Sequence, residues 1–234
     1  MDKTADPTEL ITRFLDIIKF DIAPKTREAV KDGNKVFGAA ILKKSDLSLV
    51  IADTNNASNN PLWHGEVHTI VKLYEREPSM VPDPKDCIFL ATHEPCSLCL
   101  SAITWAGYDN FYYLFSYEDT RDSFVMPYDI EILQEVFVVP PIVPSGAGAA
   151  TGGTASLSGK ESAAVAEERP LYNRSNKFWT SHHIRKMIEA LQPSSSRTEL
   201  EARVAKLKQD YADFSNVYQD SRSADEKVNA IPFS

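Results

Sequence analysis

The spacing of apolar residues predicts alternating helices and strands over the first 140 residues. Residues 8–20 have apolar positions at helical intervals, and Pro24 is expected to end that helix. Residues 36–42 and 47–52 are apolar stretches joined by a polar turn, which predicts a β-hairpin. Beyond the hairpin we expect helices over 64–75, 96–106 and 129–137, and strands over 87–92 and 111–115. This order predicts an α/β fold, a three-layer α-β-α sandwich with a mixed sheet of about five strands.

The remaining third of the chain has a different pattern. Residues 140–170 are rich in Gly, Pro, Ala and Ser, and such a segment buries too little apolar surface to offset its ordering entropy. We expect it to be a disordered low-complexity insertion. Helices are predicted over 181–191 and 198–219, and the second has an apolar stripe at steps of four and three. That stripe fits either a helix packed on its own core or a dimer contact.

These patterns divide the chain into four parts: an N-terminal helix (1–22), an α/β domain (23–139), the insertion (140–170) and a C-terminal helical extension (171–234). The 234 residues carry a formal net charge of −8, so nucleic acid is an unlikely partner and a small molecule is favoured. We find neither a membrane-spanning stretch nor a signal peptide. The expected location is cytoplasmic, with the nucleus as a second compartment reached by diffusion.

Two short segments carry the candidate chemistry. One is Trp63-His64-Gly65-Glu66, and the other is Glu94-Pro95-Cys96-Ser97-Leu98-Cys99. On its own a Cys-x-x-Cys pair could be a metal clamp, a redox dithiol or a coincidence. The combination favours a catalytic Zn²⁺ site, which takes three protein ligands and leaves one position open for water. We predict His64, Cys96 and Cys99 as the ligands, each near the first turn of a helix.

Glu66 is predicted to be the catalytic proton carrier rather than a ligand. His64 and Glu66 are two residues apart on a helix, so their side chains point in different directions and do not suit ligation of the same ion. The Glu66 carboxylate can instead lie beside a metal-bound water. Glu66 would take a proton from that water, and the hydroxide would attack the carbon bearing an amino group. Glu66 would then deliver protons to the ring nitrogen and to the departing ammonia.

These residues resemble the cytidine deaminase-like superfamily, and above all its branch of guanine deaminases, fungal cytosine deaminases and tRNA adenosine deaminases. The resemblance also includes Phe37-Gly38-Ala39 and the guanine deaminase-like residues 100–106. It implies a mixed sheet flanked by helices, a Zn²⁺ cofactor and a homodimer. It further implies that an Asn after the second strand contacts the substrate, with Asn56 as the best match and Asn55 as the near alternative. The backbone N–H of Gly65 would face the substrate as well.

Two further residues are candidates for substrate contact. Trp63 replaces the small residue that the family usually has before the ligand His, so its ring could wall the pocket, stack on a base or simply pack. His93 adjoins Glu94 near the expected metal rim. After residue 115 the resemblance fades.

Three functions stay open from the sequence. The first is a zinc-dependent hydrolytic deaminase of a nucleobase, nucleoside or related aminated heterocycle. The second is an RNA-editing enzyme or subunit that is similar to tRNA adenosine deaminases. The third is a non-catalytic zinc-binding interaction protein.

Overall fold

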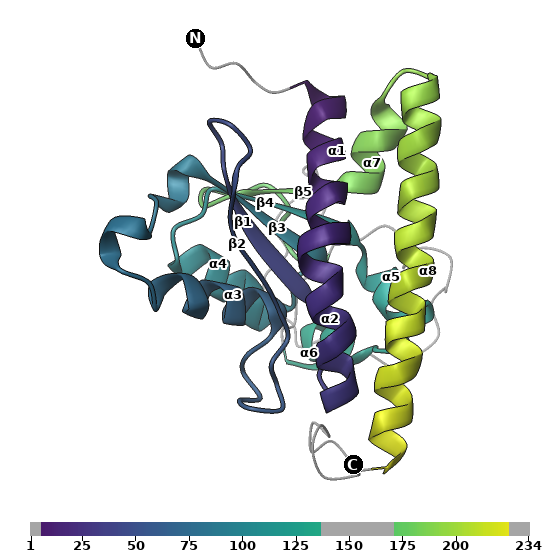
Figure 1. The fold of residues 1–234 in the computed structure, drawn as a ribbon. Helices are drawn as coiled ribbons and strands as arrows, with labels where there is room; N and C mark the ends of the chain where they lie inside the picture. Colours follow the sequence, from purple (N-terminus) through teal and green to yellow (C-terminus); the bar gives the residue numbers. More distant parts are fainter. Residues whose placement is uncertain (1–5, 137–170, 225–234) are drawn as a thin grey trace, which may run out of the picture.

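A five-stranded mixed sheet forms the centre of the molecule (Figure 1), seen in a computed structural model that describes residues 6–136 and 171–224. The strand order is β2-β1-β3-β4-β5, with β1 antiparallel to β2 and to β3, and with β3, β4 and β5 parallel. The strands are β1 (Gly38–Lys43), β2 (Leu49–Thr54), β3 (Cys87–His93), β4 (Asn110–Phe115) and β5 (Thr180–His183). The predicted mixed sheet is confirmed.

Helices cover both faces of this sheet. In Figure 1, α1, α2, α7 and α8 lie on one side of the strands and α3 and α4 on the other, and two separate apolar clusters fill the spaces between. The α-helices are α1 (Pro7–Ile17), α2 (Ala23–Ala29), α3 (Gly65–Tyr74), α4 (Ser97–Trp105), α5 (Tyr117–Asp122), α6 (Tyr128–Glu135), α7 (Ile184–Ala190) and α8 (Ser195–Ala224). The short helices are the π-helix η1 (Ile18–Ile22) and the 3₁₀ turns η2 (Val30–Asp32), η3 (Pro78–Met80) and η4 (Pro84–Asp86). The predicted three-layer α/β sandwich is confirmed.

We expected the first helix to end at Pro24, but the helical path continues past this residue. It passes through the π-turn η1 into α2, and the N–H of Ala23 bonds to the carbonyl of Ile18, five residues earlier. Pro24 therefore falls in the first turn of a new α-helical segment, where a missing N–H costs little. The π-turn shifts the hydrogen-bonding pattern of the helix by one residue between α1 and α2, and the spacing of apolar residues did not indicate this shift.

Strand β5 is another difference from the predicted elements, since residues 181–183 were assigned to a helix. The strand runs parallel to β4, and α7 begins only after it. Its sequence Thr-Ser-His-His has no apolar alternation, but the rings of His182 and His183 stack on Tyr112 and Tyr113 with centroids 4.5 and 4.8 Å apart. Aromatic pairs between neighbouring strands therefore stabilise a strand that residue propensity does not indicate.

The apolar stripe of α8 packs on the protein's own core. All six of its members are buried: Leu200, Val204, Leu207, Tyr211, Phe214 and Tyr218. This confirms the first of the two interpretations of the stripe. The predicted insertion 140–170 lies outside the described residues, and the four-part division of the chain stays a prediction. The described helices include none with the length and apolarity that a membrane span requires.

Candidate metal centre

Two helix starts bring the three predicted metal ligands together. His64 is the residue that precedes α3, and Cys96 is the residue that precedes α4, with Cys99 one turn further on. The Nδ1 atom of His64 lies 3.3 Å from Sγ of Cys96 and 3.7 Å from Sγ of Cys99. All three potential ligand atoms lie within 4.8 Å of one another.

The spacing of these atoms fits a tetrahedral zinc ion. Zinc bonds of about 2.0 Å to nitrogen and about 2.3 Å to sulfur, at the tetrahedral angle, separate N and S by about 3.5 Å. The two N–S distances of 3.3 and 3.7 Å fall on either side of that value. One imidazole and two thiols supply three ligands, which leaves the fourth position of a tetrahedron for solvent or substrate.

The surroundings also favour a thiolate, the form that binds metal. A hydrogen bond from Cys99 lowers the pKa of the Cys96 thiol well below its usual value, and His64 adds to this effect. Both cysteines lie at the start of α4, where free backbone N–H groups favour negative charge. Burial instead raises the pKa of Cys99, whose thiol donates a hydrogen bond to Glu66 Oε2 at 3.2 Å.

Glu66 lies beside the three ligand atoms and not among them. Its side chain projects from the first turn of α3, only 4% of the residue is exposed, and its carboxylate touches Cys99. Burial raises the pKa of this carboxyl to about 7, and the negative charge of Cys96 adds to the effect. Near neutral pH such a group is present in both protonation states, which suits a residue that must first accept and then donate a proton.

A close backbone contact holds this helix start in place. A Cβ on Gly65 would lie 2.6 Å from the carbonyl oxygen of Phe37 and 2.8 Å from Cα of Gly38. A Cβ on Gly38 would in turn lie 2.3 Å from Ile22. The first residue of α3 therefore packs directly on the backbone at the start of β1, and glycine is required there by space and not by backbone angle.

The loop after β2 presents Asn55 and Asn56 differently. Asn56 is engaged locally, because its Oδ1 accepts from Asn59 and its Nδ2 lies 3.4 Å from His68 Nε2. Asn55 is buried, and its Oδ1 accepts the backbone N–H groups of Lys35 and Ala57. Its Nδ2 is buried without a hydrogen-bond partner among the described residues. Of the two candidates, Asn55 is thus the one whose amide nitrogen has no hydrogen-bond partner among the described residues.

His93, which the sequence analysis proposed as a substrate contact, packs among aromatic side chains. The side chain is buried in an aromatic cluster with Phe37, Phe115, Phe124 and Tyr211. Its Nδ1 atom lies 2.9 Å from Thr92 Oγ1, and burial lowers the pKa of His93 to about 3. The residue is a neutral core histidine between the sheet and α8.

The ring of Trp63 stacks on a protein side chain. Its centroid lies 5.2 Å from that of His68, with 23° between the ring planes. His68 is itself held by its Nδ1 atom against the carbonyl oxygen of Thr54 at 2.8 Å. Packing therefore accounts for one face of the Trp63 ring.

Two charged residues near the metal centre were missed by the sequence analysis. Asp129, in the first turn of α6, interacts electrostatically with Cys96, His64, Lys35 and Glu66. Lys35 lies just before β1 and interacts with His64 as well as with Asp129. No motif marks either residue, because Lys35 lies in the segment before β1 and Asp129 lies on α6, and the positions of both depend on the tertiary fold.

Glu94, next to the Pro-Cys turn, anchors that turn to a distant part of the chain. Only 2% of Glu94 is exposed, and its carboxylate accepts hydrogen bonds from Tyr172 Oη at 2.8 Å, Arg174 Nη2 at 3.3 Å and the backbone N–H of Tyr117 at 3.1 Å. The hydroxyl of Tyr117 also donates to the carbonyl oxygen of Pro95. A segment almost 80 residues away in sequence therefore holds the metal-binding turn.

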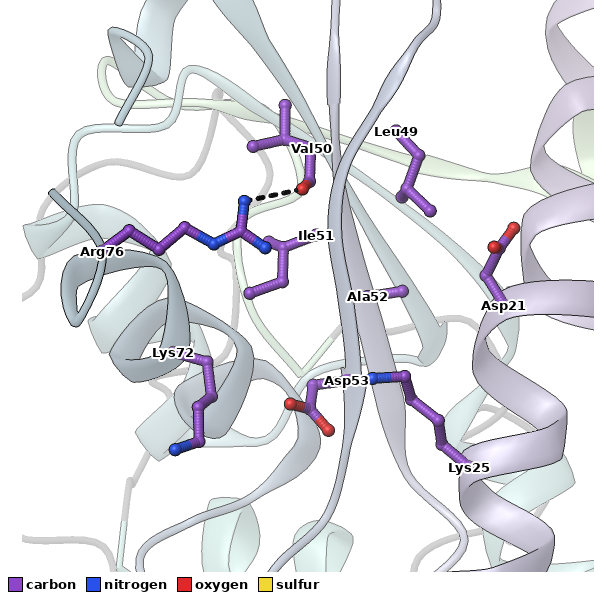
Figure 2. A pocket seen from close by; sticks show the side chains of 9 residues that line it. All are labelled: Asp21, Lys25, Leu49, Val50, Ile51, Ala52, Asp53, Lys72 and Arg76. Carbon is purple, nitrogen blue, oxygen red and sulfur yellow. Dashed lines mark hydrogen bonds between the residues drawn. The ribbon is translucent and has the colours of Figure 1, made fainter. Parts of the chain in front are cut away.

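A separate cavity of about 460 Å³ lies at the free edge of β2, away from all of these residues (Figure 2). In Figure 2, the cavity is lined on one side by Lys72 of α3 and by Arg76 just after that helix, and on the other side by Asp21 of η1 and Lys25 of α2. Arg76 Nη1 donates to the carbonyl oxygen of Val50 at 3.0 Å and so covers part of the sheet edge. None of the predicted site residues lines this cavity, so it is not the candidate site.

Comparison with known proteins supports the assignment of this region. Residues 19–115 match the family described as the cytidine and deoxycytidylate deaminase zinc-binding region, and they include His64, Glu66, Cys96 and Cys99. Residues 19–115 belong to the cytidine deaminase-like superfamily. The prediction of a zinc-binding region is thereby confirmed.

The deaminase region also has a curated relative. Over 89 residues the chain is 35% identical to guanine deaminase of Bacillus subtilis (strain 168), an alignment that covers 37% of this chain and 54% of that protein. The chain thus spans about half the length of the curated relative it matches.

Solved structures of deaminases are similar to it as well. The structure of the B. subtilis guanine deaminase is 32% identical, with a TM-score of 0.36, over 44% of this chain and 68% of that one. One from a study of tRNA:A34 deaminases is 22% identical, with a TM-score of 0.36, over 45% and 76%. Guanine deaminase from Nitrosomonas europaea is 14% identical, with a TM-score of 0.40, over 92% and 86%. At these TM-scores the superpositions add nothing to the sequence match.

Proposed function

We propose that this chain is a zinc-dependent hydrolytic deaminase of an aminated heterocycle. The observation that carries the proposal is the placement of Glu66, buried and in contact with Cys99, beside a His-Cys-Cys ligand set of tetrahedral dimensions. His64, Cys96 and Cys99 would hold the ion, which when bound acts as a Lewis acid and lowers the pKa of water. Glu66 would move protons between that water, the ring nitrogen and the amino group that leaves as ammonia.

The residues around this centre support binding of a small planar substrate. The free Nδ2 of Asn55 would donate a hydrogen bond to the heterocycle, and the backbone N–H of Gly65 would donate another. Trp63 would form a wall of the pocket with the ring face that His68 does not cover.

A homodimer is also proposed, on the basis of apolar side chains exposed on the α3–α4 layer. Trp105 is 90% exposed at the end of α4, and Leu98 and Tyr74 are exposed on the same layer. Leu98 and Trp105 are seven residues apart on one helix and so share a face. A second copy packed on this face would cover these side chains. Separately, we propose that the protein is located in the cytoplasm.

RNA editing and a non-catalytic role are weaker candidates. A net charge of −8 opposes the binding of a phosphate backbone. A purely structural zinc site would not need a buried carboxylate poised beside its ligands, and Glu66 provides one.

The test is ammonia release from guanine, cytosine, cytidine, adenosine, their deoxy forms and pterins by the zinc-loaded protein. We expect turnover of at least one compound, and we expect Glu66→Gln to abolish it while the zinc content stays at that of the wild type. A wild-type protein that holds zinc but releases ammonia from none of them would refute the proposal.

A further inference from the structure

The cavity at the free edge of β2 is a slot with a strand along its floor (Figure 2). Five consecutive residues of β2, 49–53, line it, and side chains from two helical segments form its walls. Ile51 and Ala52 are only 8% and 7% exposed, although β2 is the outermost strand of the sheet. The edge of the sheet is therefore recessed between the walls. The wall residues are Lys72 and Arg76 on one side and Asp21 and Lys25 on the other.

The backbone of Ala52 faces into this slot. The N–H of Asn55 donates to the carbonyl oxygen of Phe37 at 2.7 Å, so these two residues form a hydrogen-bonded pair across β2 and the start of β1. Bonded and non-bonded pairs alternate along antiparallel strands. Ala52 lies opposite Ala40, three positions further along, and is therefore in a non-bonded pair. The N–H and the carbonyl group of Ala52 consequently point away from β1 and toward the cavity.

The neighbouring carbonyl groups on this side already have partners, but those of Ala52 do not. The carbonyl oxygen of Val50 accepts from Arg76 Nη1 at 3.0 Å, and that of Thr54 accepts from His68 Nδ1 at 2.8 Å. Within residues 6–136 and 171–224, no group bonds to the outward N–H or carbonyl of Ala52. Backbone polar groups at a recessed edge need a partner, and an unpaired edge is a template for one more strand.

The charge of the walls selects the kind of strand that fits. The slot has one more cation than carboxylate, whereas the whole chain carries a formal net charge of −8. Arg76 uses one guanidinium N–H on Val50 and has four more to donate. Lys25 takes part in none of the ion pairs between described residues. Both cations are thus available to carboxylates that enter the slot.

Two other occupants fit this slot less well. The β2 edge of a second copy would be recessed in the same way, and its walls would meet these walls before the two strands reached the spacing of about 4.8 Å that pairing requires. A nucleic acid backbone would face Asp21 and Asp53 in the slot and a net negative chain around it. A single extended peptide is narrow enough to enter between the walls and can carry charge that matches them.

We propose that the free edge of β2 is a docking site for an extended acidic segment of a partner protein. The segment adds to the sheet as a further strand, and its backbone pairs with the N–H and the carbonyl of Ala52. Side chains of a strand point alternately to the two walls, so carboxylates at every second position reach the wall that carries Arg76 and Lys72. Carboxylates bond the guanidinium group with particular strength. This interaction surface is separate from the metal centre and does not depend on the proposed enzymatic activity.

The experiment titrates peptides into the ¹⁵N-labelled, zinc-loaded full chain and follows the backbone amides by NMR. The probes are a peptide of alternating Glu and Thr, its counterpart of alternating Lys and Thr, and the acidic peptide with all backbone nitrogens methylated. The methylated peptide keeps the charges and lacks the N–H donors. The proteins are the wild type, Arg76→Gln, Ala52→Pro and the matched control Arg121→Gln, since Arg121 is exposed and pairs with Asp122 on α5. Proline suits an edge position whose N–H faces outward.

The acidic peptide is expected to shift the amides of residues 49–54 and to bind at least about tenfold more tightly than the Lys peptide. Arg76→Gln should weaken its binding about tenfold, the change expected for one hydrogen bond to a charged group, and Arg121→Gln should leave it unchanged. The methylated peptide should not bind, and Ala52→Pro should abolish binding of the acidic peptide. If Ala52→Pro does not fold, the methylated peptide tests the same hydrogen bonds from the side of the ligand.

Several results would overturn the proposal. Binding of neither peptide by the wild type, or equal binding of the acidic and Lys peptides, would contradict an acidic docking site. Binding of the methylated peptide as tight as that of its parent would show attraction of charge without strand pairing. Wild-type dimers that Ala52→Pro converts to monomers, measured by sedimentation, would assign the edge to a second copy instead.

Discussion

The contact between Tyr172 and Glu94 gives the sharpest mutational test of how the metal-binding turn is held. Tyr172→Phe removes only the hydroxyl that donates to Glu94 Oε1 at 2.8 Å, and it keeps the ring that packs near Trp179. Glu94 is 2% exposed, so water cannot readily replace the lost donor. Oε1 would then be left with Arg174, whose Nη2 is 3.3 Å away.

The expected cost follows from the type of bond. A hydrogen bond to a charged group contributes about 1.5–3 kcal/mol, and the value applies to buried partners such as these. Because Glu94 directly precedes Pro95 and Cys96, part of this energy holds the metal-binding turn. If the whole cost falls on the turn, the affinity for zinc falls by about tenfold to about 100-fold, at 1.4 kcal/mol for each factor of ten.

The assay is transfer of zinc from the protein to a chromogenic chelator, followed alongside the free energy of urea unfolding of the zinc-loaded protein. Tyr74→Phe is the matched control, since Tyr74 lies half exposed on α3. We expect Tyr172→Phe to release zinc faster than the control and to unfold at lower urea. Equal rates and equal midpoints for the two variants would show that Glu94 does not hold the turn in this way.

Three further predictions concern other parts of the molecule. Glu66→Gln should lower kcat by at least about 10²-fold with the zinc content unchanged, and turnover at the wild-type rate would remove Glu66 as the proton carrier. His93 is neutral in the folded protein because burial lowers its pKa to about 3, whereas in the unfolded chain the pKa is about 6.5. The free energy of unfolding should therefore be independent of this residue above about pH 6.5 and should decrease as the pH falls toward 3. At pH 5 the decrease is about 2 kcal/mol. Urea unfolding at pH 5 and 7.5 should show this dependence weakened in His93→Phe, and an unchanged dependence would contradict the burial argument. Gly65→Val should destabilise the protein by about 1–3 kcal/mol and lower its zinc content, because the new side chain would collide with the backbone of Phe37. A variant with the wild-type melting temperature and full zinc content would show that α3 can move away from β1.

Local chemistry explains which features could be predicted from the sequence. His64, Cys96 and Cys99 were identifiable because a zinc site needs specific ligand types at short spacing, and the fold brings two helix starts together as expected. The strands β1 to β4 were predicted because they are buried apolar runs. The different hydrogen bonds of Asn55 and Asn56 could not be predicted from the sequence, because they depend on the path of the loop.

Other features depend on contacts that no local pattern encodes. Strand β5 forms because tyrosines of β4 stack on histidines that would otherwise suit a helix or a loop. His93 looked like a rim residue because it adjoins Glu94 in sequence, but the end of β3 directs it into the aromatic cluster below α8. Lys35 and Asp129 are almost 100 residues apart in sequence, and only the folded chain brings both within electrostatic range of the metal centre.

The central claim is that one zinc ion is held by His64, Cys96 and Cys99, and X-ray absorption at the zinc edge tests it most directly. The account predicts one zinc per chain, with two sulfur neighbours at about 2.3 Å and the remaining nitrogen or oxygen neighbours at about 2.0 Å. In Cys99→Ser the number of sulfur neighbours should fall to one. Protein purified without zinc, or a zinc shell that contains no sulfur, would contradict the account.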